Sequence, residues 1–245
     1  MTKKTGILEK KLKTYYSDTN LSNYKENLIL GLSKYTGNKF STILDIGSGV
    51  GTFADAVKPF GYKVYALEAS DYGYDTCIKK GLECKKFFLQ KGVKLPFEDK
   101  KFSLVFMNQV LEHVDKEVGQ YYIKEIVRVL EPGGVAIINS PSKYCEIWNT
   151  DPNHLYCWKP NELYQEVNQY RKELDSISLQ RVPLEPWMFQ KYNEEVINTW
   201  HKYNKYPKLK KFLHISAKLL DKIGYKFSGT DRLLASANII FVKKN

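Results

Sequence analysis

The feature that most constrains this chain is the segment ILDIGSGVGTFA (43–54), in which an apolar run leads directly into a glycine-rich turn. The run predicts a buried strand, and the residues after the turn predict a helix over 52–60. Gly47, Gly49 and Gly51 permit positive φ and carry no side chain, so main-chain N–H groups can approach a ligand closely. The helix start adds a partial positive charge that suits a carboxylate or phosphate. Because many tight turns need glycine for their shape alone, the loop indicates a ligand only in combination with its surroundings.

Apolar runs typical of strands alternate with segments typical of helices along the rest of the chain. Strands are expected at residues 41–47, 63–70, 102–108, 134–140, 173–182 and 235–245. Helices are expected at residues 7–36, 52–60, 72–81, 114–130 and 161–167. This alternation is typical of a parallel sheet covered by helices on both faces. A length of 245 residues suits one large α/β domain, and we predict a single domain over residues 1–245.

An acidic residue ends the second expected strand, KVYALEAS. Glu68 follows Gly51 by 17 residues, and an acid at that place can accept hydrogen bonds from both hydroxyls of a ribose. Taken alone, Glu68 could equally be a solvated acid at a strand end. Beside the glycine loop we favour the ribose interpretation, which predicts a ligand that contains a nucleoside.

Four segments occur in an order that is typical of one family: LDIGSGVG at 44–51, VYALEAS at 64–70, LPFEDKKFSLVFMNQVLEHV at 95–114 and VLEPGGVAIINSP at 129–141. Over about 43–141 the chain resembles the class I S-adenosylmethionine-dependent methyltransferases. NADH-binding folds share the glycine turn but lack the LEHV and LEPGG segments. The resemblance implies a Rossmann-like sheet of seven strands, mostly parallel, with the last strand antiparallel at the sheet edge. It also implies an enzyme whose cofactor is S-adenosyl-L-methionine.

The resemblance further implies a set of cofactor-binding residues. Asp45 and the loop at 47–51 are expected to hold the methionine end of the cofactor, and Glu68 is expected to bind the ribose. The end of the third expected strand is expected to lie beneath the methionine. The residues implied in this way are Asp45, Gly47, Ser48, Gly49, Glu68, Ala69, Asn108 and Gln109. One departure concerns the adenine: the acid that often precedes LPF in the family is absent from FFLQKGVKLPF, so Gln90 or a main-chain carbonyl takes that contact.

Methyl transfer from a sulfonium is an in-line displacement, so the enzyme must mainly align donor and acceptor. An oxygen acceptor must also lose its proton, to a base or with the help of a metal. Of the four histidines, His113 and His154 closely follow expected strands, and should lie at the carboxyl edge of the sheet where open α/β folds bind ligands. We expect His154 to act as a base or to orient the substrate. His201 and His214 are expected at the surface.

The pair of histidines also fits a sharper resemblance. Gln109-Val-Leu-Glu112-His113 followed by His154 looks like the Glu-x-x-Glu-His element and downstream His of ubiquinone-pathway and small-RNA 3′-end methyltransferases. In those groups the element binds a divalent cation that polarises the accepting hydroxyl. Gln109 replaces the first Glu here, but two histidines and Glu112 could still hold a cation. The alternative is that Glu112 makes local contacts and His113 packs against the sheet.

Residues 183–232 precede the final strand and are predicted to form a helical insertion, either a lid over the substrate or an oligomer interface such as that of a homodimer. From 191 to 227 they hold nine Lys and three acids, a balance of +6 within a net charge of +11. Aromatic residues mixed with lysines suit a nucleotide or phosphorylated sugar. The alternative is a helical hairpin whose aromatics fill a small core. We therefore expect an anionic small-molecule acceptor, methylated on oxygen.

Two other functions remain compatible with the sequence. An RNA 2′-O-methyltransferase fits the charge, but no Arg-rich stripe or RNA-binding module supports it, so we do not expect a nucleic-acid partner. The other is a non-catalytic protein that binds the cofactor.

The sequence also predicts where the protein is found. Because no apolar run approaches about 18 residues and the start lacks the apolar centre of a signal peptide, we expect a cytoplasmic protein with no membrane partner. Its four cysteines, Cys77, Cys84, Cys145 and Cys157, are expected to be reduced.

Overall fold

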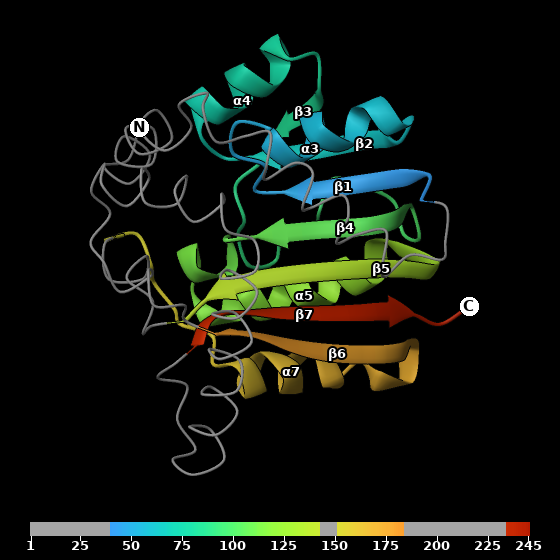
Figure 1. The fold of residues 1–245 in the computed structure, drawn as a ribbon, viewed down its shortest axis with the longest axis vertical. Coiled ribbons are helices and arrows are strands. Elements are labelled where there is room, and N and C mark those ends of the chain that lie inside the picture. The colour runs from blue at the N-terminus through green and yellow to red at the C-terminus, as the bar shows by residue number, and fades with distance from the viewer. Residues whose placement is uncertain (1–39, 143–150, 184–233) are drawn as a thin grey trace, which may run out of the picture.

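Seven strands form one mixed sheet in the computed structural model, which describes residues 40–142, 151–183 and 234–245 (Figure 1). The strand order is β3-β2-β1-β4-β5-β7-β6, and β7 runs antiparallel to both of its neighbours. The strands are β1 (Thr42–Ile46), β2 (Lys63–Glu68), β3 (Glu83–Lys86), β4 (Phe102–Asn108), β5 (Leu130–Pro141), β6 (Leu174–Pro183) and β7 (Leu234–Lys243). The predicted α/β fold with a mostly parallel, seven-stranded sheet is therefore confirmed.

Helices cover both faces of the sheet, as predicted. One face packs against α3 (Thr52–Val57) and α4 (Asp71–Lys79), and the other against α5 (Lys116–Val129) and α7 (Pro160–Asn168). Three short 3-10 turns, η1 (Lys58–Phe60), η2 (Leu111–His113) and η3 (Arg171–Glu173), complete the described elements. Alternate residues of each strand point to opposite faces, so the sheet supplies side chains to two separate hydrophobic clusters.

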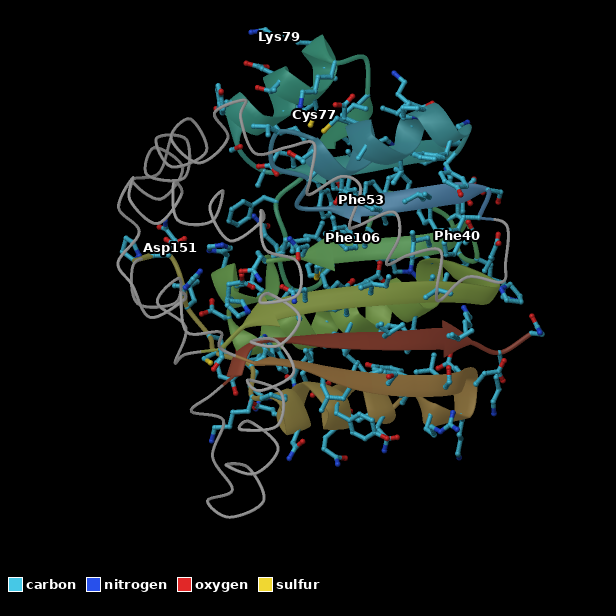
Figure 2. The ribbon with its side chains drawn as sticks, viewed as in Figure 1. Phe40, Phe53, Cys77, Lys79, Phe106 and Asp151 are labelled. Atoms are coloured by element: carbon cyan, nitrogen blue, oxygen red, sulfur yellow. The ribbon has the colours of Figure 1, made fainter. Side chains whose placement is uncertain are left out.

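Phe53 and Phe106 show how a helix is fixed to this sheet. The ring of Phe53 on α3 stacks on that of Phe106 on β4, with ring centroids 4.1 Å apart (Figure 2). Both side chains are buried, and an aromatic pair of this kind contributes about 0.5–1.5 kcal/mol beyond the apolar area it buries. The contact holds the start of α3, and with it the preceding glycine loop, over the end of β1 and β4.

The last strand does not lie where the resemblance placed it. We expected the final strand at the sheet edge, but β7 lies between β5 and β6, and β6 forms the edge. The sequence of β7 explains this position, because Ile239 and Phe241 are buried against one face and Ile240 against the other. A strand buried on both faces is typical of the interior of a sheet. The expectation of an edge position was therefore wrong.

The strand β3 was missed by the pattern of apolar residues. Its sequence is ECKK, and Cys84 is its only buried residue. Among the described strands β3 pairs with β2 alone, at the opposite edge of the sheet, so it needs few apolar side chains. Charged residues are usual on edge strands because they discourage pairing with other chains.

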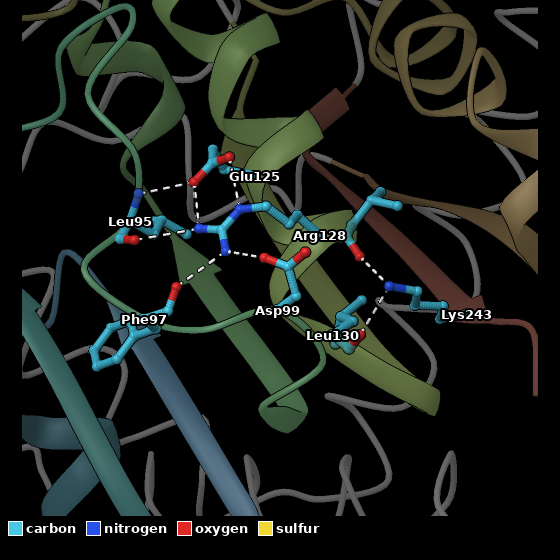
Figure 3. Close-up of polar contacts among 8 residues, drawn as sticks. Leu95, Phe97, Asp99, Glu125, Arg128, Leu130 and Lys243 are labelled. Atoms are coloured by element: carbon cyan, nitrogen blue, oxygen red, sulfur yellow. Dashed lines mark hydrogen bonds and ion pairs between the residues drawn. The ribbon is translucent and has the colours of Figure 1, made fainter.

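One face of α5 holds the segment between β3 and β4 through a network of polar contacts (Figure 3). Arg128 donates to the carboxylates of Glu125, at 2.6 and 2.9 Å, and of Asp99, at 2.7 Å. It also donates to the carbonyls of Leu95 and Phe97, at 3.2 and 3.0 Å. Because Arg128 on α5 bonds to Asp99 and to two carbonyls of this segment, it fixes the segment against α5 on its way to the start of β4.

Several expectations concern parts of the chain that the structure leaves undescribed. Outside the described residues lie the expected helix at 7–36, nearly all of the 183–232 insertion, and the residues Cys145, His201 and His214. The described cysteines, Cys77, Cys84 and Cys157, form no disulfide with one another. No helix within the described ranges is both long and apolar enough to cross a bilayer.

Candidate functional site

The glycine-rich loop follows β1 at the point where the strand order reverses, because β1 is flanked by β2 and β4. Open α/β sheets bind their ligands outside the carboxyl ends of the strands at such a point. Gly47, Gly49 and Gly51 have φ values of 70°, 57° and 73°, in the left-handed region that favours glycine. The Leu67 carbonyl accepts hydrogen bonds from the amides of Gly47 and Ser48, at 2.8 and 3.0 Å. These bonds fix the loop to the end of β2.

Glu68, the buried last residue of β2, holds the loop through its carboxylate. Its Oε2 accepts from the Gly49 amide at 2.8 Å, and its Oε1 accepts from the amide and hydroxyl of Ser70 at 2.8 and 2.7 Å. The Ser70 hydroxyl in turn accepts from the Gly73 amide at 3.1 Å and caps α4. A carboxylate has about four acceptor positions, so Glu68 retains capacity for a ribose hydroxyl. Ala69, beside it, is half-buried.

Gly73 is a residue of this region that the sequence analysis missed. A Cβ at Gly73 would lie 2.6 Å from the Gly49 carbonyl oxygen and 2.8 Å from Glu68 Cγ. The first of these atoms belongs to the main chain and cannot rotate away, so a larger residue would push α4 off the loop. In the sequence, the position of Gly73 three residues after Ser70 was the only available signal, and it does not distinguish close approach from an ordinary helix start.

Asp45 lies on β1 and is almost fully buried, with 3% of its surface exposed. Its Oδ2 has no hydrogen-bond partner among the described residues. Burial raises the pKa of Asp45 well above its ordinary value; Cys77 and Glu68 raise it further, and the Ala54 amide lowers it. A buried carboxylate oxygen without a donor is costly. Its place beside the glycine loop fits a ligand that brings a positive charge, as the methionine end of S-adenosylmethionine does.

The residue that follows β4 has a strained main-chain conformation. Asn108 is half-buried, and Gln109 has a φ of 57°, which is uncommon for a residue other than glycine and recurs at functional sites. Two contacts hold Gln109 in place: its amide donates to the Asn139 carbonyl at 3.0 Å, and its side chain donates to the Asn139 side chain. This strand end lies beside the β5 end, as the register Asn108↔Asn139 requires.

Gln90, the residue considered for the adenine, lies on the segment that α5 holds. Its amide donates to the Tyr122 hydroxyl at 3.1 Å, and the same hydroxyl lies within donating distance of the carbonyls of Gln90, at 3.1 Å, and Val93, at 2.8 Å. The main-chain groups of Gln90 therefore face Tyr122, whereas the residue itself is exposed.

Glu112, His113 and His154 come together at the same edge of the sheet. Each offers one ligand atom, and the three atoms lie within 4.8 Å of one another, a spacing that would suit a metal ion. The rings of His113 and His154 have centroids 4.9 Å apart. Glu112 is fully buried and accepts a hydrogen bond from the Ser140 hydroxyl at 3.4 Å. Gln109 lies outside this cluster, since its side chain bonds to Asn139.

Main-chain contacts bring His154 to this place from far along the chain. The Glu112 carbonyl accepts hydrogen bonds from the amides of Leu155 and Tyr156, at 2.7 and 3.3 Å. Figure 2 shows Asp151, at the start of the same turn, beyond the carboxyl ends of the parallel strands. The segment is fixed further by Glu162 on α7, which accepts from the Tyr156 hydroxyl and, at 2.5 Å, from the Lys116 ammonium.

Val110 connects the cluster to the glycine loop. A Cβ at Gly47 would lie only 2.3 Å from Val110 Cγ2, so the loop and the residue before η2 are in direct contact. The Glu112–His113–His154 cluster therefore adjoins the loop at the carboxyl edge, on the β4 side of the switch point.

Comparisons with known proteins agree with this geometry. Residues 44–138 match the family described as a methyltransferase domain. The ubiquinone biosynthesis O-methyltransferase of Rickettsia bellii (strain OSU 85-389) is 26% identical over 152 residues, which cover 55% of this chain and 62% of that protein. The chain thus spans less than two thirds of the length of this curated relative.

Two solved structures share the fold. A SAM-dependent methyltransferase from Archaeoglobus fulgidus superposes with a TM-score of 0.65 at 18% identity, covering 97% of this chain and 98% of the other. The Haemonchus contortus phosphoethanolamine N-methyltransferase 2, in complex with S-adenosyl-L-methionine, superposes with a TM-score of 0.59 at 18% identity. The superposition covers 89% of this chain and 53% of the other. These two structures show the fold alone, whereas the match over residues 44–138, which include the glycine loop at the switch point, identifies this part of the chain as a methyltransferase domain of the S-adenosylmethionine-dependent class.

Proposed function

We propose that this chain transfers the methyl group of S-adenosylmethionine to a hydroxyl oxygen of a polar small molecule, with a divalent cation held by Glu112, His113 and His154. The observation that carries the proposal is the close approach of these three side chains, within 4.8 Å, beside the glycine loop. The curated relative at 26% identity is an O-methyltransferase by name, which supports oxygen as the accepting atom.

The donor side of the reaction depends on the loop and the residues that hold it. When bound, S-adenosylmethionine supplies the methyl group as a sulfonium. In our proposal Asp45 and the loop from Gly47 to Gly49 bind its methionine end, Glu68 and Ala69 its ribose, and Asn108 and Gln109 line the site beneath the methionine. These residues orient the donor, and orientation can remove about 7–11 kcal/mol of the barrier to such a displacement.

The acceptor side must lower the cost of removing a proton from the hydroxyl. A bound divalent cation supplies charge that stabilises the oxyanion. Glu112 provides one negative ligand in a fully buried position, and the two neutral imidazoles provide nitrogen ligands, a donor set that suits several divalent metals. If no cation is bound, His154 takes the proton as a general base.

The acceptor itself is proposed to be anionic. The net charge of +11 favours a phosphorylated or nucleotide-linked molecule over a neutral one. The relative's name adds a second class to test, the hydroxylated aromatic ring of a ubiquinone precursor.

Thermal unfolding in the presence of ligands tests the proposal. A ligand that binds only the folded state raises the unfolding midpoint, so S-adenosylhomocysteine should raise it, and Mg²⁺ or Mn²⁺ should raise it independently. A panel of nucleotide sugars, sugar phosphates and catechols, added with S-adenosylhomocysteine, should contain one class that raises it further. Turnover on that class should stop with chelator and return with the cation. No shift with S-adenosylhomocysteine would contradict the donor site, and turnover indifferent to chelator would contradict the cation.

A further inference from the structure

Two side chains near the end of α4 bind consecutive carbonyl groups of the glycine-rich loop. The Sγ atom of Cys77 lies 3.5 Å from the carbonyl oxygen of Gly49, and the ammonium of Lys80 donates to the carbonyl of Val50 at 2.9 Å. Lys80 is the C-cap residue of α4 and follows Cys77 by three positions. Residues three apart on a helix are neighbours on its surface, so one face of α4 reaches both carbonyls.

Both loop carbonyls depend on these donors because they are shielded from water. A carbonyl oxygen only accepts hydrogen bonds, so the thiol of Cys77 is the donor to Gly49. Gly49 and Val50 are both buried, and Cys77 has no exposed surface. A buried carbonyl that loses its donor is costly, and the loop would have to rearrange to find another.

The first contact fixes the direction of the Val50 amide. No peptide bond of the described residues is cis, and in a planar trans peptide the N–H points opposite to the C=O. The carbonyl of Gly49 faces Cys77 on α4. The amide of Val50 belongs to the same peptide group, so it points away from α4.

The second contact fixes the next peptide group in the same way. The carbonyl of Val50 faces Lys80, and the amide of Gly51 donates on the other side to the carbonyl of Ser48, at 2.9 Å. The amide of Val50, in contrast, makes no hydrogen bond with any residue that the structure describes. Buried main-chain N–H groups nearly always have a partner, so this amide is available to a ligand at the loop.

We propose that α4 orients the loop for the cofactor, with Cys77 and Lys80 as positioning residues. They hold the carbonyls of Gly49 and Val50, and in this way they direct the amide of Val50 toward the bound donor. Both side chains act through the loop. The inference rests on the proposed donor site, because the orientation of the loop matters to the reaction only if the loop binds S-adenosylmethionine.

Lys80→Met tests the stronger of the two contacts, because methionine keeps much of the apolar stem and lacks the ammonium. We expect S-adenosylhomocysteine binding, measured by calorimetry, to weaken about 10-fold, near the lower end of what a hydrogen bond to a charged group contributes. Lys79→Met makes the same change at the exposed neighbouring position and should leave the affinity unchanged. Lys80→Arg keeps a cationic donor on a long stem and should restore most of the affinity. Wild-type affinity in Lys80→Met would overturn the role of Lys80.

Cys77→Ala tests the weaker contact, since a thiol is a weak donor. We expect binding to weaken about 2- to 5-fold. Val64→Ala removes packing from the same core cluster, on β2, and should lower the unfolding midpoint without changing the affinity. If Cys77→Ala behaves like Val64→Ala, with a lower midpoint and wild-type affinity, Cys77 only fills the core and its positioning role is overturned.

NMR of the ligand-free chain shows the contact with Lys80 without binding or turnover. In protein labelled with ¹³C and ¹⁵N, Lys80→Met should move the signal of the Val50 carbonyl carbon, and Lys79→Met should not. An unmoved signal in Lys80→Met would overturn the contact. If the wild type does not bind S-adenosylhomocysteine, the donor site of the proposed function fails together with this inference. If the wild type binds it and both Lys80→Met and Cys77→Ala bind equally well, this inference fails alone.

Discussion

The two halves of the carboxyl edge present different kinds of chemical group. On the β2 side of the switch point, the chain offers main-chain groups of the glycine loop, with Glu68 tied to the Gly49 amide. On the β4 side it offers side chains, Glu112, His113 and His154, drawn from two segments of the sequence. The first half is formed by residues close together along the chain, whereas the second depends on a turn carried to Glu112 by main-chain hydrogen bonds.

The difference reflects what each half must do. A cofactor that is the same for a whole family can be bound by a backbone shape, because glycines and helix starts provide it with few side chains. An acceptor differs from one enzyme to the next, so the acceptor site that we propose on the β4 side is made of groups that can be exchanged without rebuilding the loop. Variants in one half should show whether cofactor affinity and turnover on the acceptor can be changed independently.

The largest expected effect is on the cofactor half. Glu68→Ala should weaken S-adenosylhomocysteine binding by about 100-fold, because hydrogen bonds to a charged group contribute about 1.5–3 kcal/mol each and each 1.4 kcal/mol is a factor of ten. Calorimetry measures this directly, with Glu83→Ala, an exposed acid on β3, as the control. Near-normal affinity in Glu68→Ala would remove the ribose assignment.

The acceptor half should respond in turnover and not in cofactor affinity. His154→Ala should lower the rate on the acceptor by about 10²- to 10⁴-fold, the range typical of lost proton transfer. S-adenosylhomocysteine affinity should stay as in the wild type, because the loop is untouched. Glu117→Gln, at an exposed position of α5, is the control. Equal losses of affinity and rate would show that the two halves are one unit.

Gly73→Ala tests the contact between α4 and the glycine loop. Alanine normally favours a helix over glycine by about 1 kcal/mol, yet the Cβ would lie 2.6 Å from the Gly49 carbonyl oxygen. We expect a net loss of about 1–3 kcal/mol, typical of overpacking, and weaker cofactor binding. In Gly61→Ala, where nothing lies within 4 Å of the new Cβ, the strained φ lowers stability but binding should remain. A more stable Gly73→Ala protein would refute the close contact.

Asp45→Asn should weaken cofactor binding and make the ligand-free fold more stable. Because burial raises the pKa of Asp45, the ligand-free fold binds a proton more tightly than the unfolded chain. Its stability therefore falls as pH rises from the ordinary carboxyl pKa to the raised one. Asparagine removes this dependence, and at pH 7 we expect a gain of about 1 kcal/mol, or roughly 2–4 °C in the unfolding midpoint, together with weaker S-adenosylhomocysteine binding. An unchanged pH dependence would contradict the role of Asp45.

The smallest effect is expected from Glu162→Gln, which weakens the contacts that hold the His154 segment. Burial opposes ionisation of Glu162, but Lys116 and Tyr156 outweigh it and lower its pKa. This group stabilises the fold above its ordinary pKa, and the contribution disappears as pH falls through the lowered value. Because the ion pair is partly exposed, we expect a loss of at most about 1 kcal/mol in thermal unfolding at pH 7, and a smaller loss as pH falls below the ordinary carboxyl pKa. A loss above 3 kcal/mol would mean that the segment depends on Glu162 alone.

The sequence predicted the interior of the fold better than its edges. Buried strands such as β1 and β4 are continuous apolar runs, so they were found, whereas β3 is an edge strand with one buried residue and no pattern. The apolar residues of β7 suit the interior of the sheet, but they do not say which two strands it lies between, because pairing order depends on which strands it meets.

The candidate site shows the same limit. The glycines and Glu68 stand at a fixed spacing, so the pattern suggested them together, and the family resemblance added Asp45. Gly73 matters through what it approaches, namely the Gly49 carbonyl, and this contact leaves no mark in the order of residues. His113 and His154 were named as candidates, but only the structure shows that both rings lie close enough to Glu112 to share one ion.

The position of β7 has a consequence for the order in which the protein can fold during synthesis. Within the described sheet, β6 pairs with β7 alone, and β5 has β7 as its outer neighbour. When a ribosome has made residues up to 183, β6 has no strand to join, and the outer edge of β5 remains open. Translation must continue through residue 234 and beyond before the gap can be filled. A nascent or truncated chain lacking β7 would expose two unpaired edges, the kind of surface that chaperones cover and that aggregates recruit.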